Sequence, residues 1–377
     1  MRELNKIKIT YIISDIDRAV AFEWIADQLD NRRFELSFIL MNKQDSYLEK
    51  YLIEKNITLV KIHYRGKKDI LKAILKIFFF LRKNKTEVVH GHLFEASLCG
   101  MMAARLAGVK KRIYTRHYSN QHHTYFPSAV KYDLLINKLS THIVAISKNV
   151  QDILIRVEKV NPAKVYLIHH GFKLELFERS EISPSRISTL KNKYHLSNQH
   201  PVVGVISRFI HLKGLQYIIP AFAKLLSTFP NAVLVLANAT GNYQNEIEKL
   251  ISGIPPVNYR KIKFENDIFA LYQLFDVFVH VPVDRESEAF GQTYVEALAA
   301  GIPSVFTLSG VAPEFIVHQK NAWVVPHQNS DAIHDAIKSI LNDAGKNKLM
   351  LEQGKKDANE FFSIHRMIHL LTVLYEN

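Results

Sequence analysis

The sequence predicts an α/β protein with two parallel, doubly wound sheets, one in each half of the chain. Short apolar segments rich in β-branched residues alternate with segments of helical spacing from residue 7 to residue 170, and the alternation resumes at residue 201. A strand, a helix and a second strand in succession are typical of a parallel sheet. The stretch between these halves, residues 178–200, is polar and contains Ser-Pro-Ser, which indicates a connection between two domains.

The first half supplies one sheet. Residues 7–14 alternate as a strand, residues 19–29 have helical spacing, and residues 34–41 form the next strand. Further strands are expected at residues 57–64, 87–93, 112–117, 141–147 and 164–170, with a helix between successive strands. Right-handed crossovers between such strands give a parallel sheet with helices on both faces.

The second half repeats this organisation. Its strands are expected at residues 201–207, 232–237, 261–264, 277–281, 304–307 and 323–326, and the chain closes with an amphipathic helix at residues 361–375. We therefore expect an amino-terminal domain at residues 1–180, a linker at 181–200 and a second domain at 201–360. Because open α/β sheets bind ligands beyond the carboxyl ends of their strands, the two domains are expected to face a central cleft.

Composition limits the class of protein. A chain of 377 residues, 47% apolar, can bury two cores. The single cysteine, Cys99, excludes an internal disulfide framework and a thiolate metal cluster. No apolar run approaches the ~20 residues that span a bilayer, and the amino terminus lacks the apolar core of a signal peptide. A cytoplasmic protein is expected, and its formal net charge of +13 indicates attraction to anions such as nucleic acid, acidic lipid or phosphorylated substrates.

Residues 286–307, ESEAFGQTYVEALAAGIPSVFT, have the features of a binding site. A helix is expected at residues 292–300, ended by Gly301 and Pro303. Helical spacing places two small polar side chains and one carboxylate on the same face: Gln292, Thr293 and Glu296. The alternative is an amphipathic helix whose glutamates are simply solvated.

The loop before this helix adds a second carboxylate, Glu288, and the backbone of Ala289, Phe290 and Gly291. Amides at a helix amino terminus favour anions such as phosphates, while carboxylates accept hydrogen bonds from sugar hydroxyls. The strand at residues 201–207 likewise leads into a loop with two cations, Arg208 and Lys213, whose charges suit a diphosphate. Solvated surface cations are the alternative.

Two of these motifs resemble the donor-binding motifs of retaining glycosyltransferases of family 4, which have the GT-B fold with two Rossmann-like domains. They are EAFGQTYVEALAAGIP, where Glu288 and Glu296 are eight residues apart, and Arg208 with Lys213 in an R-x4-K-G context. The resemblance implies that Glu296 holds the ribose hydroxyls of a nucleoside diphosphate sugar. It further implies that Glu288 and the backbone of residues 289–291 hold the donor sugar, and that Arg208 and Lys213 bind its diphosphate.

The stretches VVHGHLFEASLCGMMAARLAG and KKRIYTRHYS resemble the first domain of the same family. This resemblance matches His117 to the family's active-site histidine, which contacts the donor sugar or diphosphate, and places the helical tail at residues 361–377 on the first domain. A zinc cluster of His117, His122 and His123 is the alternative, but no carboxylate or thiolate pattern accompanies it. We expect neither a metal nor another cofactor.

Some positions depart from the family pattern. The glycine-rich loop after the first strand is replaced by Ser14, Asp15, Ile16, Asp17 and Arg18. Residues 238–241 contain less glycine than the family pattern, and Ala322 stands where glycine is usual. These departures leave the base of the donor and the acceptor open.

Residues 67–85 combine helical apolar spacing with many cations. The apolar positions are Ile70, Ile74, Ile77, Phe78 and Leu81, and the basic positions are Lys67, Lys68, Lys72, Lys76, Arg82, Lys83 and Lys85. Such a helix could rest on an anionic membrane, at the inner face of the plasma membrane. Alternatively, it covers the sheet with its apolar stripe while its lysines face water.

The resemblance implies a retaining glycosyltransferase that uses a nucleoside diphosphate sugar and a saccharide or lipid-linked saccharide acceptor in cell-surface glycan synthesis. Arg208, Lys213 and the helix amides would stabilise the departing diphosphate, so no protein nucleophile is needed. The alternatives are a nucleotide-sugar epimerase or phosphorylase of the same fold, and a basic nucleic-acid-binding protein. Nucleic acid is not an expected partner, because the sequence has no recognisable aromatic and basic recognition motif.

Overall fold

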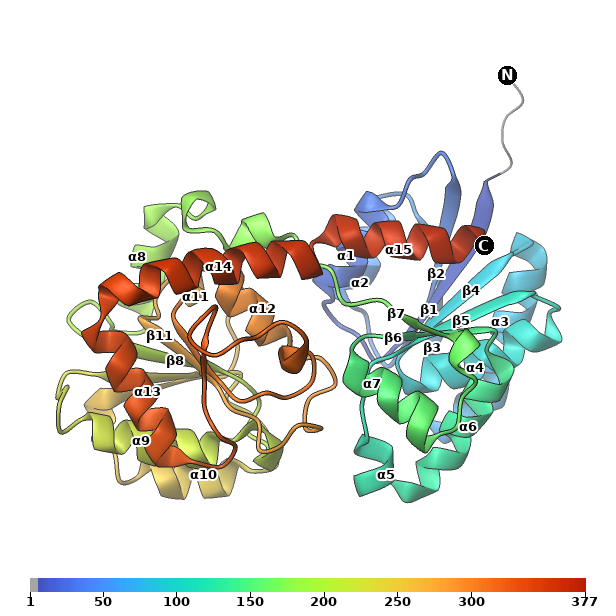
Figure 1. Cartoon of the computed structure of the whole chain (residues 1–377). Coiled ribbons are helices and arrows are strands. Elements are labelled where there is room, and N and C mark those ends of the chain that lie inside the picture. The colour runs from blue at the N-terminus through green and yellow to red at the C-terminus, as the bar shows by residue number, and fades with distance from the viewer. Residues whose placement is uncertain (1–5) are drawn as a thin grey trace. The chain divides into compact units, whose positions relative to one another are not determined.

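The computed structural model describes residues 6–377, which form two compact units (Figure 1). The first unit runs to Phe172 and also includes residues 364–377, and the second comprises residues 173–363. The predicted class, two doubly wound α/β units, is confirmed. Residues 1–5, which we assigned to the amino-terminal domain, lie outside the described residues. No helix within residues 6–377 is long and apolar enough to cross a membrane.

The sheet of the first unit has seven parallel strands in the order β3-β2-β1-β4-β5-β6-β7. Their bounds are β1 (Ile7–Ser14), β2 (Phe34–Asn42), β3 (Thr58–His63), β4 (Val88–His92), β5 (Lys111–Arg116), β6 (His142–Ala145) and β7 (Val165–Leu167). Ile9 of the central strand lies opposite Leu36 on one side and Val88 on the other. The strand order reverses between β1 and β4, where open α/β sheets bind ligands.

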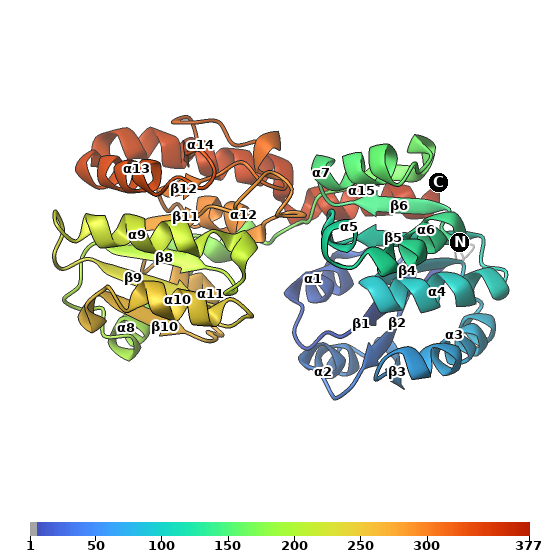
Figure 2. The ribbon, with the colours of Figure 1, turned by 90° about the horizontal axis from the view of Figure 1, so that it is seen from below.

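Helices cover both faces of this sheet. The longer ones are α1 (Val20–Gln28), α2 (Tyr47–Glu54), α3 (Ile70–Asn84), α4 (Phe94–Leu106), α6 (Val130–Leu139) and α15 (Ile364–Glu376). The short helices are α5 (Gln121–Tyr125) and α7 (Lys148–Asp152), and a π-helical segment, η3 (Ile153–Val157), continues α7. α3 and α4 pack side by side (Figure 2).

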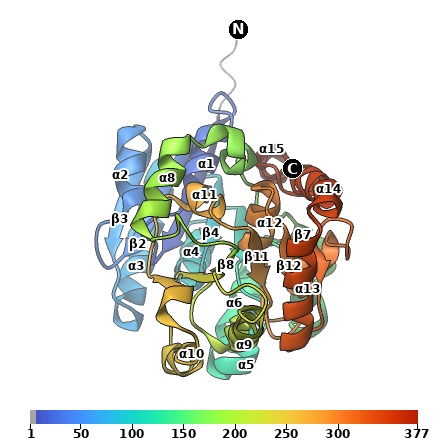
Figure 3. The same ribbon diagram turned by 90° about the vertical axis from the view of Figure 1, so that its left-hand side faces the viewer.

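The second unit has six parallel strands in the order β10-β9-β8-β11-β12-β13. They are β8 (Val202–Ile206), β9 (Val233–Ala237), β10 (Tyr259–Ile262), β11 (Val277–His280), β12 (Ser304–Phe306) and β13 (Trp323–Val324). The helices are α9 (Leu215–Leu225), α10 (Gln244–Ile251), α11 (Ile268–Tyr272), α12 (Gln292–Ala299), α13 (Ser330–Asn342) and α14 (Ala344–Phe362). α9 packs against α13 (Figure 3). Here the order reverses between β8 and β11.

The last helix, α15, is anchored in the first unit by buried polar contacts. The Tyr375 hydroxyl hydrogen-bonds to the Tyr11 hydroxyl and to Nδ1 of His90, the latter at 2.7 Å. Lys111 Nζ donates to the Tyr375 carbonyl at 2.8 Å. Burial lowers the pKa of His90 to about 3, so this ring is neutral at physiological pH. The carboxyl-terminal turn is therefore fixed to β1, β4 and β5.

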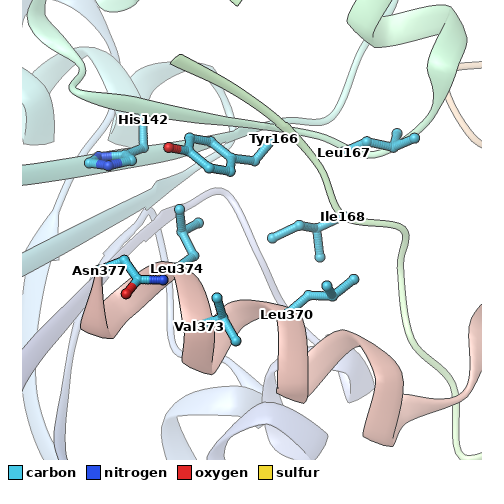
Figure 4. A pocket seen from close by; sticks show the side chains of 8 residues that line it. All are labelled: His142, Tyr166, Leu167, Ile168, Leu370, Val373, Leu374 and Asn377. Carbon is cyan, nitrogen blue, oxygen red and sulfur yellow. The ribbon is translucent and has the colours of Figure 1, made fainter. Parts of the chain in front are cut away.

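A pocket of about 250 Å³ lies between β7 and α15 in the first unit (Figure 4). Its lining is largely apolar and comprises His142, Tyr166, Leu167, Ile168, Leu370, Val373, Leu374 and Asn377. None of the site residues chosen from the sequence contributes to it.

The predicted linker at residues 181–200 differs from the structure. It contains helix α8 (Pro184–Lys193), which belongs to the second unit. Ile187 and Leu190 of this helix are buried, and Arg186 forms a two-pronged ion pair with Asp267 at 2.8 and 2.6 Å. The stretch is polar overall, but two apolar residues three apart are enough to hold one short helix against its neighbour. The tail helix predicted at residues 361–375 is present as α15, which begins at Ile364, after a break at Ser363 that separates it from α14.

The predicted apolar stripe of residues 67–85 is part of the core. A short 3₁₀ turn, η1 (Lys67–Asp69), precedes α3, and Ile74, Ile77 and Leu81 are buried in the first unit. The stripe therefore covers the sheet and α4, as the second interpretation predicts. Contact of this helix with a membrane stays a prediction.

Gly214, at the start of α9, has a backbone φ of 75° and lies close to the backbone of Val281. A Cβ there would lie 1.9 Å from the carbonyl oxygen of Val281. Gly108 has a similar φ of 78°, but a Cβ there would meet nothing within 4 Å. Replacing either glycine with alanine puts a side chain in the left-handed region, at a cost of roughly 1–2 kcal/mol.

We expect Gly214→Ala to lower the free energy of unfolding by at least about 2 kcal/mol more than Gly108→Ala, because only the former also creates a clash. Denaturant unfolding of both variants measures the difference. If both substitutions lower the free energy of unfolding equally, the close approach of Gly214 to Val281 does not constrain the fold.

Candidate active site

The candidate site of the second unit lies at the carboxyl ends of β8 and β11. Arg208 follows β8 by two residues, His280 is the last residue of β11, and Glu288 lies in the loop between β11 and α12. This is the point at which the strand order reverses. The residues predicted from two separate motifs therefore come together at the usual ligand position of an open α/β sheet.

A buried carboxylate is at the centre of this site. Glu288 is 7% exposed, and its Oε1 is paired with Lys213 Nζ and lies 3.2 Å from Nε2 of His280. Burial by itself raises the pKa of a carboxyl group, but the charge of Lys213 and the neighbouring His280 lower the pKa of Glu288 to about 2. Burial lowers the pKa of His280. At neutral pH the site thus holds an anionic Glu288, a cationic Lys213 and a neutral His280.

A second loop fixes the position of Glu288. The backbone N–H of Glu288 donates to Ser309 Oγ at 3.1 Å, and the N–H of Gly310 donates to the Arg285 carbonyl at 3.1 Å. Gly310 has a φ of 59°, and a Cβ there would lie 2.7 Å from the Cβ of Glu288. Glycine is therefore required for this approach.

Helix α12 presents the polar face that its spacing predicts. Gln292 is exposed and Thr293 and Glu296 are partly exposed, whereas Tyr294 and Val295 are buried. The buried Oγ1 of Thr293 has no hydrogen-bond partner within residues 6–377. The positive end of the helix dipole and this hydroxyl are available to an anionic or hydroxylated ligand.

The two predicted cations differ in their surroundings. Arg208 is exposed, and within the part of the chain that the structure describes its guanidinium has no hydrogen bond or ion pair. Lys213 lies in a 3₁₀ turn, η7 (His211–Lys213), and is held by Glu288. The Arg208 guanidinium is therefore available to bind a ligand, while the Lys213 side chain is already oriented by Glu288.

Glu296 has a buried partner that the sequence did not reveal. The Tyr272 hydroxyl, at the end of α11, donates to Glu296 Oε2 at 2.7 Å. Burial raises the pKa of Glu296 to about 7, and the hydrogen bond from Tyr272 opposes this effect only in part. Glu296 therefore changes its charge near neutral pH.

In the first unit, His117 belongs to a group of histidines. It follows β5, and its Nε2 lies 3.1 Å from Nδ1 of His92, the last residue of β4. Its ring stacks on that of His170, with centroids 5.4 Å apart. Burial, together with the neighbouring histidines, lowers the pKa of His92 and His117 well below the ordinary value. These rings are neutral hydrogen-bonding groups at the carboxyl edge of the first sheet.

His92 and His170 were missed in the sequence analysis, although they lie at or near the ends of predicted strands. His122 and His123 have different partners, since Nδ1 of His122 is 2.8 Å from Asp133 and Nε2 of His123 is 3.1 Å from Glu158. Among residues 6–377 there is no group of three His, Cys, Asp or Glu side chains that could hold a metal ion.

Two of the departures from the family's glycine pattern, those at residues 14–18 and 238–241, have a local explanation. Asp15 has a φ of 50° and Asn238 a φ of 60°, so both adopt the left-handed conformation. Asp and Asn tolerate it better than other residues with side chains. The side chain of Asn42 also clamps the first loop, through bonds of 3.0 and 2.7 Å to the backbone of Ile16.

Two family models match the chain. The model described as Glycosyltransferase Family 4 matches residues 23–176, and the one described as Glycosyl transferases group 1 matches residues 187–357. Among curated relatives, the capsular polysaccharide biosynthesis glycosyltransferase CapM of Staphylococcus aureus is 28% identical over 302 residues, which cover 78% of this chain and 77% of CapM. An Escherichia coli enzyme named UDP-Gal:alpha-D-GlcNAc-diphosphoundecaprenol alpha-1,3-galactosyltransferase is 21% identical, with 96% and 95% covered.

Solved structures agree on the fold. Anabaena HepE in complex with UDP and glucose superposes with a TM-score of 0.83 at 20% identity, covering 98% of this chain and all of HepE. A glycosyltransferase from Rickettsia africae gives a TM-score of 0.81 at 20% identity, with 99% and 98% covered. Both units of the chain are thus matched, by family models that meet near the boundary between them and by structures of the whole length. The chain belongs to the group 1 glycosyltransferases of the GT-B fold, with an amino-terminal domain of the family 4 type.

Proposed function

We propose that this glycosyltransferase moves a sugar from a nucleoside diphosphate sugar to a saccharide or lipid-linked saccharide, with retention at the anomeric carbon, in cell-surface glycan synthesis. The observation that carries the proposal is the buried, ionised Glu288 held by Lys213 ahead of the amino terminus of α12. The names of CapM and of the E. coli galactosyltransferase support a role in surface glycan synthesis. Crystal structures of HepE with UDP and with UDP-glucose support a nucleotide-sugar donor.

The donor would occupy the second unit in three parts. Glu296 accepts hydrogen bonds from the ribose hydroxyls. The Glu288 carboxylate accepts hydrogen bonds from the hydroxyls of the donor sugar, and the backbone of residues 289–291 donates hydrogen bonds to this sugar. Arg208, Lys213 and the first amides of α12, at Gln292 and Thr293, bind the diphosphate. Because the pKa of Glu288 is about 2, this group remains a hydrogen-bond acceptor at neutral pH and does not act as a general acid.

The chemistry follows from this charge distribution. Departure of the diphosphate concentrates negative charge, which Arg208, Lys213 and the α12 amides stabilise more strongly in the transition state than in the bound donor. We propose that these groups supply this stabilisation without a metal or other cofactor. The departing phosphate takes the proton of the acceptor hydroxyl, and neutral His117 donates a hydrogen bond to the donor sugar or diphosphate. We place this reaction in the cytoplasm, consistent with a single, buried, unpaired thiol, Cys99.

The proposed activity is tested by incubating the protein with a panel of nucleotide sugars and with saccharide and lipid-linked acceptors. We expect release of the nucleoside diphosphate that depends on the acceptor, and a product whose new bond keeps the donor's anomeric configuration by NMR. Conversion of donor without an acceptor would indicate an epimerase, and a requirement for inorganic phosphate would indicate a phosphorylase. An inverted product would contradict the retaining mechanism.

Replacing Lys213 with methionine should both destabilise the protein and depress turnover. Glu288 would then be buried without its counter-charge, which costs about 3 kcal/mol at pH 7. The double variant Lys213→Met with Glu288→Gln should recover most of this stability but none of the turnover, because the diphosphate still lacks its lysine. Denaturant unfolding and kcat separate the two effects. A single variant with unchanged kcat/KM, or a double variant no more stable than the single, would contradict the assignment.

Glu296→Gln should weaken binding of the nucleoside diphosphate by roughly 10- to 100-fold, because hydrogen bonds to a charged acceptor contribute about 1.5–3 kcal/mol. Titration calorimetry on both proteins at pH 8, where Glu296 of the wild type is ionised, gives the ratio. Glu360→Gln, on the exposed side of α14, serves as the control and should bind as the wild type does. Equal affinities for all three proteins would remove Glu296 from the ribose site.

The same substitution should change the dependence of stability on pH. The pKa of Glu296 is raised to about 7 in the folded chain, so between its ordinary value of 4.5 and pH 7 the folded state binds more protons than the unfolded state. Stability from this group is therefore present at low pH and lost as pH rises to 7. Relative to the wild type, Glu296→Gln should gain in Tm between pH 5 and pH 8. A parallel pH dependence of Tm in the two proteins would show that Glu296 titrates normally.

A further inference from the structure

The register of the first sheet places His92 beside His117. His92 is the last residue of β4 and lies opposite Thr115 of β5. His117 comes two residues after Thr115, and side chains two residues apart along a strand point to the same face of a sheet. Nδ1 of His92 lies 3.1 Å from Nε2 of His117, which is the distance of a hydrogen bond between the two rings.

Packing fixes the planes of both rings. His92 is 5% exposed, and its ring stacks on that of Tyr11, with centroids 5.3 Å apart and an angle of 7° between the planes. The ring of Phe22 meets His92 edge-on, with centroids 4.8 Å apart. His117 stacks in turn on His170, at an angle of 16°. The geometry of the hydrogen bond between His92 and His117 is therefore set by their aromatic neighbours.

The direction of this hydrogen bond determines what His117 can do. Burial lowers the pKa of His92 and of His117, so both imidazoles are neutral, and each has one N–H and one unprotonated nitrogen. Two directions are possible. Either Nδ1–H of His92 donates to Nε2 of His117, or Nε2–H of His117 donates to Nδ1 of His92. In the second case the hydrogen of His92 must lie on its Nε2.

The other nitrogen of His92 favours the first direction. Its Nε2 is buried and has no hydrogen-bond partner within the part of the chain that the structure describes. The adjacent His90 contrasts with it, since its Nδ1 and Nε2 lie 2.7 and 2.8 Å from the hydroxyls of Tyr375 and Thr115. A buried N–H without an acceptor is rarer in proteins than an acceptor that lacks a donor. The hydrogen of His92 is therefore assigned to Nδ1, and His92 donates to His117.

This direction leaves the hydrogen of His117 on Nδ1. In the proposed reaction, neutral His117 donates a hydrogen bond to the donor sugar or diphosphate, which requires an N–H that His92 does not occupy. In the opposite direction, His117 would use its one N–H on His92. It could then only accept a hydrogen bond at Nδ1, and an acceptor does not stabilise the negative charge of a departing diphosphate.

We infer that His92 is a positioning residue for the proposed transfer, because its Nδ1–H holds His117 in the tautomer that presents Nδ1–H to the donor. The inference deepens the proposed function and rests on it for the role of His117. His92 itself is buried and acts only through His117. The tautomer of His117 is a property of the free protein, and it is therefore measured without donor, acceptor or turnover.

The first test is NMR of protein whose histidine rings carry nitrogen-15, because protonated and unprotonated ring nitrogens give distinct signals. The signals of His117 are those that disappear in His117→Gln. We expect the hydrogen of His117 on Nδ1 in the wild type. We expect it there also in His92→Asn, since the asparagine amide stands where Nδ1 of His92 does and can donate in the same way. His92→Leu has no donor, so both tautomers of His117 should be present.

Turnover separates this role from packing alone. Leucine fills the space beside Tyr11 and Phe22 better than asparagine and buries no amide, so a residue that only packed would tolerate leucine better. We expect the opposite order of activity. His92→Leu should lower kcat roughly 10- to 100-fold, with a smaller change in KM for the donor, because the lost bond matters most as the diphosphate leaves.

The asparagine variant and a surface variant are the controls. His92→Asn should keep kcat within about fivefold of the wild type, since a neutral hydrogen bond at the same place is retained. His365→Leu, on the exposed side of α15, should act as the wild type does. A Tm of His92→Leu at or above that of His92→Asn would show that the loss of turnover is not a loss of the fold.

The inference is overturned if Nε2 of His117 carries the hydrogen in the wild type, or if His117 keeps its hydrogen on Nδ1 alone in His92→Leu. It is also overturned if His92→Leu turns over as fast as His92→Asn. Should His92→Leu fail to fold, the signals of the wild type and of His92→Asn still decide the direction of the bond. The expected tautomers in a protein that transfers no sugar would refute the proposed function and leave the bond from His92 to His117 established.

Discussion

The buried negative charge of Glu288 is the constraint on which the second unit's site depends. A carboxylate that is 7% exposed is stable only beside a positive charge, and Lys213 provides it. This lysine can reach Glu288 because the chain turns at Gly214, close against the backbone of Val281. On the other side, Gly310 lets its loop approach the Glu288 side chain. The ion pair at the centre of the site therefore depends on the backbone conformation at these two glycines.

The buried titratable groups of the two units differ in their charge at neutral pH. In the second, Glu288 keeps its charge through Lys213, and Glu296 has only a hydroxyl partner, so its pKa rises to about 7. In the first, His92 and His117 are neutral because burial disfavours their charged forms. Charged groups suit a diphosphate and ribose, whereas neutral imidazoles suit hydroxyls. This difference agrees with the proposed diphosphate and ribose site in the second unit and with the proposed hydrogen bond from neutral His117 to the donor sugar.

Much of the fold was predictable from the sequence, since buried parallel strands are short apolar runs and every predicted strand is present. The motif residues Lys213 and Glu288 were predictable too, but their contact was not, because it joins residues 75 positions apart. Tyr272 and His280 were missed for the same reason. Helical periodicity identified the buried stripe of α3. Helix α8 was missed because its segment is polar on average.

We propose that the second unit binds the diphosphate between Lys213 and the start of α12. Hydrogen exchange of the full chain, measured with and without UDP or GDP, tests this proposal most directly. We expect slower amide exchange at residues 208–214 and 288–294 in the presence of the nucleotide that raises Tm. Protection confined to the first unit, for example around the pocket between β7 and α15, with none at residues 288–294, would contradict it.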